Sequence, residues 1–430
     1  MPSNKKKELT NPWTPEDEGD HYPVAKEWWT IETLFSTKED RRKWNLITTF
    51  AYELEGPSCF YQHILFDITA KKPVAHRDLN DDITKFKHTK NKVDLSYEKS
   101  FFKGLYPSYN FHIEDSKYDF IADMMYKAQS LPHWSAQDAT NGYLPIGFDH
   151  FRYGWLLNCN LSGTLKFKGK NYTVDGKGYL EHAYGNWSYR NPFQQLSSLK
   201  KTFTTYMKLT NNWTSHNKPR IPKHIAFSTE NNIFGYDWFW SVAQNNWSIF
   251  YGNFMCWISE GPAFGVLSIS PDGKEFWDFY NVRFRYTKMR YNKKFDFYYP
   301  SEMEVVGKLG KKTVHLRVWS VTESYEYTDP YTSKIYKVFA LCEMPGKMEG
   351  SLNDGNKITK LTGDCKIVPQ RQSSILGHNK LSIDVVKPPK GIGMKFELDS
   401  HHFMKKIKTE FNLTSRPLFK IHMKKQSKQN

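Results

Sequence analysis

Two short segments of this chain place acidic, imidazole and aromatic side chains close together in the sequence. A carboxylic acid that burial keeps protonated can donate a proton, because desolvation raises its pKa. A neutral histidine or tyrosine can position water, and aromatic faces stabilise a cation. In GYLEHAYG and YDWFW, the candidate catalytic residues are Glu181, His182, Tyr184 and Asp237. The candidate substrate-binding residues are Tyr236, Trp238 and Trp240, with Asp149 and His150 from GFDHFRYGW. These residue types can together protonate a weak base, hold the resulting cation and deliver water to it.

Each of these assignments has an alternative that the sequence leaves open. A single histidine on an apolar strand face can be a hydrogen-bonded core residue instead of a site residue. Asp237 points away from Trp238 and Trp240 on an ideal strand, so it needs a bulge to join them or else aligns strands through a hydrogen bond. Asp149 and His150 are the alternative acid–imidazole pair. The two tryptophans can also be core residues, since large aromatic side chains dominate protein cores.

The elements that must position these residues are predicted to be antiparallel strands. Apolar residues alternate with polar ones over 161–167, which is the period of a half-buried strand. Gly169 then predicts a hairpin turn. One face of the following strand holds Tyr172, Val174, Leu180, His182 and Tyr184. We expect His182 to point into a barrel and toward the YDWFW strand. Its polar partner should be Asp237, Asp149, a tyrosine hydroxyl or a backbone carbonyl.

Three segments, in this order, carry a resemblance to a known family. KEWWTIETLF (Lys26–Phe35) is similar to an E-W-W-Y opening, GKGYLEHAYG to a G-x-G-x-x-D-H-x-W-G segment, and FGYDWFWSVAQNN (Phe234–Asn246) to a W-D-W-F strand. These motifs belong to the lipocalin-like family that contains the acyclic carotenoid 1,2-hydratases (hydroxyneurosporene synthases) and the AttH-type proteins. Glu181 stands where that family usually has aspartate, and Tyr184 where it usually has tryptophan.

The resemblance implies a cofactor-independent hydro-lyase. Such an enzyme would add water to an alkene of a hydrophobic isoprenoid or carotenoid-type substrate, starting with a proton from an acid. The alternative is a non-catalytic lipocalin-like protein that binds a hydrophobic small molecule, since barrels of this kind can hold one. A structural protein with a filled cavity is a third hypothesis, because a fold does not determine a function.

Other catalytic and metal-binding patterns are not found in the sequence. It has no G-x-S-x-G, P-loop or H-E-x-x-H motif. His401 and His402 are adjacent and lack the spacing of a structural metal site. We therefore expect no metal site and no cofactor.

Length and composition indicate an all-β protein with two main domains. The chain has 430 residues, enough for two or three domains, and its aromatic content of 16% favours strands. We predict two lipocalin-like antiparallel β-barrels packed together, with a boundary between residues 265 and 285. The predicted parts are a loose lead-in (1–25), a first barrel (26–272) with an insertion over its mouth (188–232), a second barrel (273–403) and a basic tail (404–430).

The second half of the chain is predicted to repeat the first. Gly163, Leu165 and Gly176 are matched in spacing by Gly350, Leu352 and Gly363. In this alignment Pro369 takes the place of His182, so the second copy would lack the imidazole.

Charge and cysteine content bear on partners and compartment. The net charge of +16 can attract an anionic membrane surface, but no nucleic-acid motif accompanies it, so we expect no nucleic-acid partner. Five cysteines without C-x-x-C spacing indicate free thiols and a reducing compartment. The first residues contain no apolar signal-peptide core, and no apolar run reaches about 18 residues. The expected location is the cytoplasm, with a peripheral membrane contact as a further expectation. The sequence leaves the oligomeric state undetermined.

Overall fold

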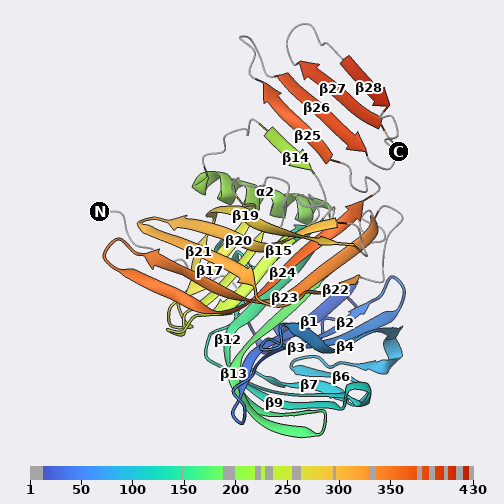
Figure 1. Ribbon diagram of the computed structural model, residues 1–430, viewed down its shortest axis with the longest axis vertical. Coiled ribbons are helices and arrows are strands. Elements are labelled where there is room, and N and C mark those ends of the chain that lie inside the picture. The colour runs from blue at the N-terminus through green and yellow to red at the C-terminus, as the bar shows by residue number, and fades with distance from the viewer. Residues whose placement is uncertain are drawn as a thin grey trace.

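The computed structural model describes most of the chain as antiparallel β-structure (Figure 1). The described residues are 13–146, 149–186, 199–217, 224–227, 236–253, 263–293, 297–328, 336–374, 380–386, 393–400, 405–412 and 420–425. Among them, no helix is long and apolar enough to cross a membrane.

The first sheet nearly closes into a barrel. Its path runs β4-β3-β2-β1-β13-β12-β9-β8-β7-β6-β5, and a single 3-10 turn, η2 (Ile83–Lys85), joins the two edge strands. Its strands are β1 (Lys26–Thr37), β2 (Lys43–Glu53), β3 (Ser58–Asp67), β4 (Lys72–Asp82), β5 (Phe86–Lys87), β6 (Val93–Tyr97), β7 (Ser100–Leu105), β8 (Ser108–Asp115), β9 (Phe120–Ala128), β10 (His133–Trp134), β11 (Tyr143–Ile146), β12 (Asp149–Phe167) and β13 (Lys170–Gly185).

Alternation along β1 explains how this barrel packs. Trp29, Ile31 and Phe35 point inward and join a core of aromatic and aliphatic side chains. Trp28 and Leu34 point outward and pack against a second cluster, which both main sheets share. The barrel interior is filled by large buried side chains, among them Trp29, Phe50, Tyr61, Phe102, Tyr109 and Tyr126.

The second sheet is a half-barrel around its own core. Its path runs β18-β17-β16-β15-β24-β23-β21-β20-β19, and β22 adds to β23. Its strands are β15 (Tyr236–Val242), β16 (Ser248–Asn253), β17 (Gly265–Ser270), β18 (Trp277–Phe279), β19 (Asn281–Asn292), β20 (Phe297–Leu309), β21 (Lys312–Ser320), β22 (Tyr325–Thr328), β23 (Tyr336–Asn353) and β24 (Ile358–Ser374).

The second sheet repeats the strand order of the first, which confirms the predicted repeat. The order β4-β3-β2-β1-β13-β12-β9-β8-β7 is matched strand for strand by β18-β17-β16-β15-β24-β23-β21-β20-β19. The matched glycines also have matched surroundings. A Cβ at Gly163 would lie 2.1 Å from the carbonyl oxygen of Asp123 in β9, and one at Gly350 would lie 1.9 Å from that of His315 in β21. Each glycine therefore permits the same close approach of neighbouring strands.

The predicted domain boundary is wrong. Leu267 of β17 pairs with Phe279 of β18, so a division at 272/273 would cut through one sheet. The chain changes sheet earlier, between Gly185 and Tyr236. The physical reason is that YDWFW opens the second repeat, in β15, as KEWWT opens the first, in β1. The two motifs were assigned to one barrel but belong to two.

The predicted second barrel and tail also need correction at their ends. A third, five-stranded sheet lies beyond the second one and has the order β14-β25-β26-β27-β28 (Figure 1). Its strands are β14 (His224–Phe227), β25 (Lys380–Val386), β26 (Gly393–Ser400), β27 (Lys405–Asn412) and β28 (Lys420–Lys425). Residues 380–400 therefore leave the second barrel, and the predicted tail contributes two strands.

The predicted insertion contains the helix α2 (Leu199–His216), but the helix does not cover the barrel mouth. Leu209 packs into the cluster shared by the two main sheets, and the Trp213 indole N–H donates to the Ala263 carbonyl oxygen at 2.8 Å. The helix α2 also packs against β11, β12 and the short helix α1 (Gln137–Thr140). Residues 188–198, 218–223 and 228–232 of the predicted insertion lie outside the described residues.

The mouth of the first barrel is covered instead by the segment before β1. This segment was predicted to be loose, but its described part, from residue 13, includes the turn η1 (Pro15–Asp17). The Trp29 indole donates to the Glu18 carbonyl oxygen at 3.1 Å, and the Tyr109 hydroxyl donates to the Glu18 carboxylate at 2.9 Å. These buried contacts fasten the segment across the barrel end.

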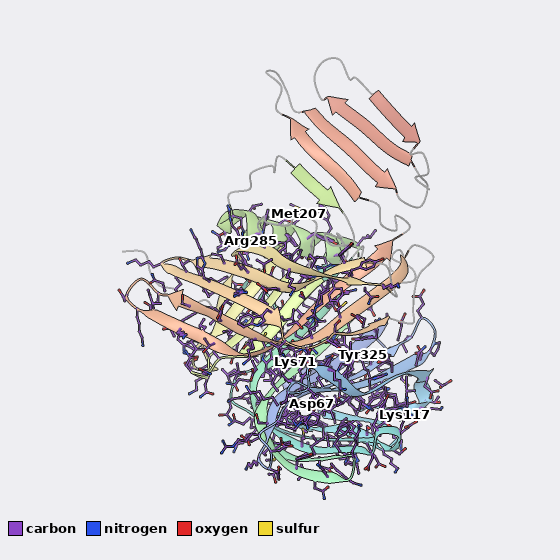
Figure 2. The ribbon with its side chains drawn as sticks, viewed as in Figure 1. Asp67, Lys71, Lys117, Met207, Arg285 and Tyr325 are labelled. Carbon is purple, nitrogen blue, oxygen red and sulfur yellow. The ribbon has the colours of Figure 1, made fainter. Side chains whose placement is uncertain are left out.

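A second contact between the two main sheets lies at β22. Tyr325 and Tyr327 pack against Ile47, Ile64 and Phe66 on the outer face of the first barrel. The Tyr325 hydroxyl also donates to the Asp78 carboxylate. Figure 2 shows Tyr325 at the junction of the two sheets.

Candidate active site

The strand β13 presents the central candidate residues on two opposite faces. It pairs with β1 on one side and β12 on the other, so alternate side chains point into the barrel or toward the second sheet. Leu180 and Val174 face the barrel core, and His182 follows them. Tyr179 and Ala183 face the shared cluster between the sheets, and Glu181 lies between them. Adjacent residues of one motif thus serve two different sites.

The Glu181 carboxyl group is buried and held by three donors, and we call this group, with its donors, the inter-sheet site. The Trp28 indole N–H donates to Oε1 at 2.7 Å, and the hydroxyls of Tyr153 and Tyr179 donate to Oε2 at 2.5 and 2.8 Å. Only 7% of Glu181 is exposed. Burial raises the pKa of Glu181, and the hydrogen bonds from Tyr153, Trp28 and Tyr179 oppose that shift. The result is a carboxylic acid with increased affinity for its proton.

Aromatic rings from both sheets surround the inter-sheet site. The Tyr179 ring lies 5.8 Å from the Trp238 ring and 5.5 Å from the Trp240 ring, between centroids. Phe250 of β16 stacks on Trp155 of β12 at 4.0 Å. Such faces carry the negative potential that favours a nearby cation. The site therefore combines an acid with surroundings suited to a carbocation.

The aromatic face predicted for YDWFW is confirmed, but its two tryptophans differ in burial and in contacts. Tyr236, Trp238, Trp240 and Val242 all contact the shared cluster. Trp240 is fully buried, and its indole N–H donates to the Leu157 carbonyl oxygen of β12 at 2.7 Å. Trp240 is therefore a core residue that joins the sheets. Trp238 lies closer to the surface and remains the better candidate for contact with a substrate.

Two cavities lie along the junction of the sheets. A small one of about 20 Å³ lies under α2, between Leu209, Trp213, Phe264 and Tyr280. A larger one of about 500 Å³ is lined from the first barrel by Leu34, Lys43 and Lys177, and from the second sheet by Val242, Trp319 and Met348, among others.

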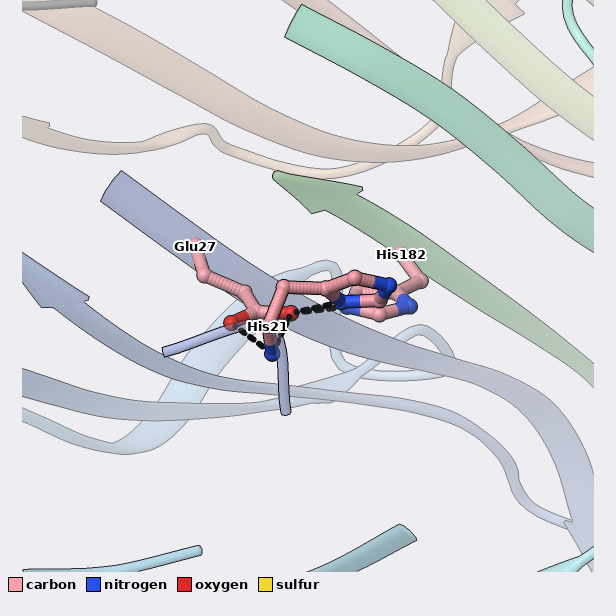
Figure 3. A group of neighbouring side chains, drawn as sticks. All are labelled: His21, Glu27 and His182. Atoms are coloured by element: carbon pink, nitrogen blue, oxygen red, sulfur yellow. Dashed lines mark hydrogen bonds and ion pairs between the residues drawn. The ribbon is translucent and has the colours of Figure 1, made fainter. Parts of the chain in front are cut away.

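On the other face of β13, His182 has polar partners at both ring nitrogens. Nδ1 lies 2.8 Å from the Asp17 carbonyl oxygen, and Nε2 lies 2.8 Å from Glu27 Oε1. A backbone carbonyl was among the predicted partners and is confirmed; Glu27 was not anticipated. Figure 3 shows His182 and Glu27 meeting with His21, whose ring stacks on Tyr184 at 3.4 Å. Tyr184 thus contributes to this group and not to the inter-sheet site.

Glu27 is the centre of this group, which we call the barrel-mouth cluster (His21, Glu27, Tyr52 and His182). The Tyr52 hydroxyl donates to Glu27 Oε2 at 2.7 Å, and His21 Nδ1 lies 2.8 Å from Oε1. Burial disfavours the Glu27 carboxylate, but the hydrogen bonds from His182 and His21 outweigh that effect and lower the pKa of Glu27 to about 2.

The predicted convergence of Asp237 and His182 is wrong. Asp237 points into the half-barrel, where it pairs with Arg371 at 2.8 Å and accepts a hydrogen bond from the Tyr286 hydroxyl. The reason is that alternation sends Asp237 to the face opposite Trp238 within β15, and β15 belongs to the second sheet. Its role as an acid at the His182 site is therefore not supported by the geometry.

The alternative pair is only partly described. His150 Nδ1 lies 3.3 Å from the Thr202 hydroxyl of α2, and burial, with a contribution from Lys201, lowers the pKa of His150 to about 4. The side chain of Asp149 lies outside the part of the chain that the structure describes.

Six residues that the structure places in these two sites were not predicted from the sequence: Trp28, Tyr153 and Tyr179 at the inter-sheet site, and His21, Glu27 and Tyr52 in the barrel-mouth cluster. Trp28 and Glu27 stand in the KEWW motif, one of the three segments that carry the family resemblance. Tyr179 precedes Glu181 by two residues, so the alternation of side chains along a strand was the signal that could have found it on the same face. Tyr153 reaches Glu181 only because β12 pairs with β13, with Tyr153 opposite Ala183.

Comparisons with known proteins show a shared fold. No family model matches the sequence, and no curated protein sequence matches it. The crystal structure of an AttH candidate from Nitrosomonas europaea matches with a TM-score of 0.58 at 12% identity, covering 84% of this chain and 97% of that chain. Kievitone hydratase from Nectria haematococca matches with a TM-score of 0.54 at 12% identity, covering 86% of this chain and 95% of that one. The near-closed barrel followed by a half-barrel is thus the fold of these two proteins.

Proposed function

We propose that this protein is a cofactor-independent hydro-lyase that adds water to an alkene of a hydrophobic, isoprenoid or carotenoid-type substrate. The observation that carries the proposal is the inter-sheet site. There a buried carboxyl with a raised pKa lies among aromatic faces of both sheets. The likeness in fold to kievitone hydratase, named for a hydration, supports this reaction class.

The reaction begins with protonation of the alkene by the Glu181 carboxylic acid. The π electrons form the new C–H bond and leave a tertiary cation, which the faces of Trp238 and Tyr179 stabilise. Water then attacks the cation and forms the C–O bond. The proton that this water loses returns to the Glu181 carboxylate, so the acid is regenerated and the net change is the addition of one water molecule.

The surroundings of Glu181 stabilise both of its protonation states during the reaction. While the acid is protonated, burial favours its neutral form. After proton transfer, Trp28, Tyr153 and Tyr179 donate to the new carboxylate, as donors placed in advance for a developing charge do.

The substitution Glu181→Gln tests this proposal. Glutamine keeps the side-chain volume and an acceptor oxygen but cannot donate a proton from an acid. Purified protein is incubated with polyene and isoprenoid lipids in H₂¹⁸O, and mass spectrometry measures ¹⁸O incorporation. We expect the wild type to incorporate ¹⁸O and Glu181→Gln to lose at least about 100-fold of the rate, the lower range for general acid catalysis.

Glu18→Gln is the matched control. Glu18 is also buried, also has a pKa raised by burial, and also accepts a tyrosine hydrogen bond, but it lies inside the mouth of the first barrel. We expect this variant to keep the wild-type rate. Equal loss in both variants, or an unchanged rate in Glu181→Gln, contradicts the assignment of the acid.

The second candidate function is that of a non-catalytic carrier of a hydrophobic small molecule. The cavity of about 500 Å³ between the sheets favours binding of a small molecule, because ligand pockets commonly have about this size. Its lining combines apolar side chains, such as Leu34, Val242 and Trp319, with charged and polar ones, such as Lys43, Lys177, Lys347 and Glu349. Because large buried side chains fill the interior of the first barrel, we expect such a ligand to bind between the sheets and not inside that barrel. The incubation in H₂¹⁸O distinguishes the two functions. If the protein is a carrier, mass spectrometry should find the bound lipid with its mass unchanged.

A further inference from the structure

Three potential metal ligands meet at the mouth of the first barrel from three parts of the chain. His21 comes from the segment before β1, Glu27 from β1 and His182 from β13. One ligand atom of each lies within 4.8 Å of the other two (Figure 3). Two imidazoles and a carboxylate form a ligand set that divalent transition metals accept. None of this was visible in the sequence, where His21 and His182 are far apart.

The contact between His182 Nε2 and Glu27 Oε1 requires a positive charge between the two atoms when the His182 ring is neutral. The Asp17 carbonyl oxygen can only accept, so His182 Nδ1 carries a hydrogen. In a neutral ring Nε2 then has a lone pair, and it faces Glu27 Oε1 at 2.8 Å. Two lone pairs at this distance repel each other unless a positive charge lies between them. That charge is either a second proton on His182 or a bound metal ion.

The surroundings of the cluster orient the ligands as the outer contacts of metal sites do. A histidine that binds a metal usually donates its other ring N–H to a carbonyl or carboxylate, as His182 does to Asp17. Glu27 Oε2 is held by the Tyr52 hydroxyl at 2.7 Å and by the His21 backbone N–H at 3.0 Å. Trp29 stacks on the His182 ring at 4.6 Å and fixes its plane. Oε1 is thereby turned toward both imidazoles.

We propose that His21, Glu27 and His182 bind a divalent transition-metal ion, with Zn²⁺ as the best match. Ligands around tetrahedral zinc lie about 3.3 Å apart, so each nitrogen, now 2.8 Å from Oε1, moves away from it by about half an ångström. The ligand atoms lie within 4.8 Å of one another, so the two nitrogens approach each other by at most about 1.5 Å. The side chain of His21 is 20% exposed, which leaves an approach for the ion and for a water molecule as fourth ligand. The ion would clamp the segment before β1 across the barrel mouth.

This site is separate from the proposed chemistry. It lies on the face of β13 opposite Glu181, and the hydration steps do not pass through it. Glu181→Gln should therefore bind Zn²⁺ as the wild type does, and failure of either proposal leaves the other standing.

The experiment measures zinc in the full chain, prepared without a histidine tag, stripped with EDTA and dialysed against micromolar Zn²⁺. We expect elemental analysis to find about one Zn²⁺ per chain in the wild type. His21→Ala should weaken Zn²⁺ binding by more than the roughly 10- to 100-fold that loss of an outer contact costs. In the wild type Zn²⁺ should raise the melting temperature, and in His21→Ala it should not. Circular dichroism confirms that the variant is folded, which its partly exposed side chain favours.

His112→Ala is the matched control for adventitious binding. His112 lies on the surface with two acidic neighbours, Asp123 and Glu114, and could collect zinc without a built site. We expect this variant to keep the wild-type Zn²⁺ content. Two outcomes overturn the proposal: a wild type without stoichiometric zinc, which leaves a buried imidazolium–carboxylate pair, or His21→Ala retaining zinc while His112→Ala loses it.

Discussion

At the residue scale, the decisive feature is that neighbours in the sequence have different neighbours in space. Glu181 meets Trp28, Tyr153 and Tyr179 between the sheets, whereas His182 meets Glu27 inside the barrel mouth. Asp237, which is directly next to Trp238 in the sequence, meets neither group. Its partner is Arg371, which is also fully buried. We therefore interpret Asp237 as a structural residue of the half-barrel.

Asp237→Asn should destabilise the protein strongly without removing the acid of the proposed reaction. Removing one partner of a buried ion pair costs roughly 3–5 kcal/mol, because the other charge stays buried without compensation. Urea denaturation should show a loss of this size in the free energy of unfolding.

Lys43→Ala is the control for this prediction. Lys43 pairs with Asp364 at 2.6 Å, but both side chains are substantially exposed, so its loss should cost at most about 1 kcal/mol. If Asp237→Asn unfolds like the wild type but loses turnover, Asp237 is the acid and Glu181 is not.

At the element scale, the outer face of β1 forms a buried charged contact with the second sheet. Lys366 of β24 lies 2.7 Å from Glu343 of β23 and 3.5 Å from Glu32 of β1. Burial raises the pKa of Glu32 to about 8; Lys366 opposes this shift and Glu343 adds to it. We therefore expect the stability of the sheet pair to depend on pH.

Glu32→Gln should flatten that dependence. Between pH about 4.5 and 8 the folded protein keeps a proton on Glu32 that the unfolded chain has lost, so the free energy of unfolding falls as pH rises. A single such group contributes at most about 1.4 kcal/mol per pH unit. The variant should therefore lose less stability than the wild type between pH 5 and 8, as urea denaturation at several pH values would measure.

Glu349→Gln serves as the comparison, because Glu349 is exposed and pairs with Arg317 on the surface. It should keep the wild-type slope. A Glu32→Gln slope equal to the wild type would mean that Glu32 is ionised in the folded protein.

At the scale of the whole molecule, two sheets with the same strand order each enclose a core of their own and share a further cluster of buried side chains. The shared cluster takes Trp155 and Tyr179 from the first barrel, Trp240 and Phe250 from the second sheet, and Leu209 from α2. Neither sheet covers this aromatic surface by itself. The two copies are thus separate sheets that pack against each other through this cluster.

We expect the two main sheets to unfold together. Tryptophan fluorescence and far-ultraviolet circular dichroism should give the same midpoint in urea, as a cooperative transition requires.

Phe250→Ala should weaken the coupling between the two sheets, because Phe250 is fully buried against Trp155 and its removal costs about 3–5 kcal/mol. In that variant the two midpoints should separate. Phe203→Ala, at an exposed position of α2, should leave them together. Two transitions already in the wild type would contradict the shared core.

The sequence by itself determined the local features of this protein. Period-2 alternation predicted strands and assigned Trp238 and Trp240 to one face and Asp237 to the other, as observed. The spacing of Gly163 and Gly176 revealed the repeat, because glycines at close strand contacts recur wherever the same sheet is built. These features depend on residues that are near each other in the chain.

Only the tertiary structure decided which faces meet. Alternation tells which side of a strand a residue takes, but not which strand lies opposite, because that depends on pairing between distant segments. GYLEHAYG and YDWFW therefore looked like parts of one site, although they belong to two separate sheets. For the same reason His21 and Glu27 could not be connected with His182 before β1 was seen to pair with β13.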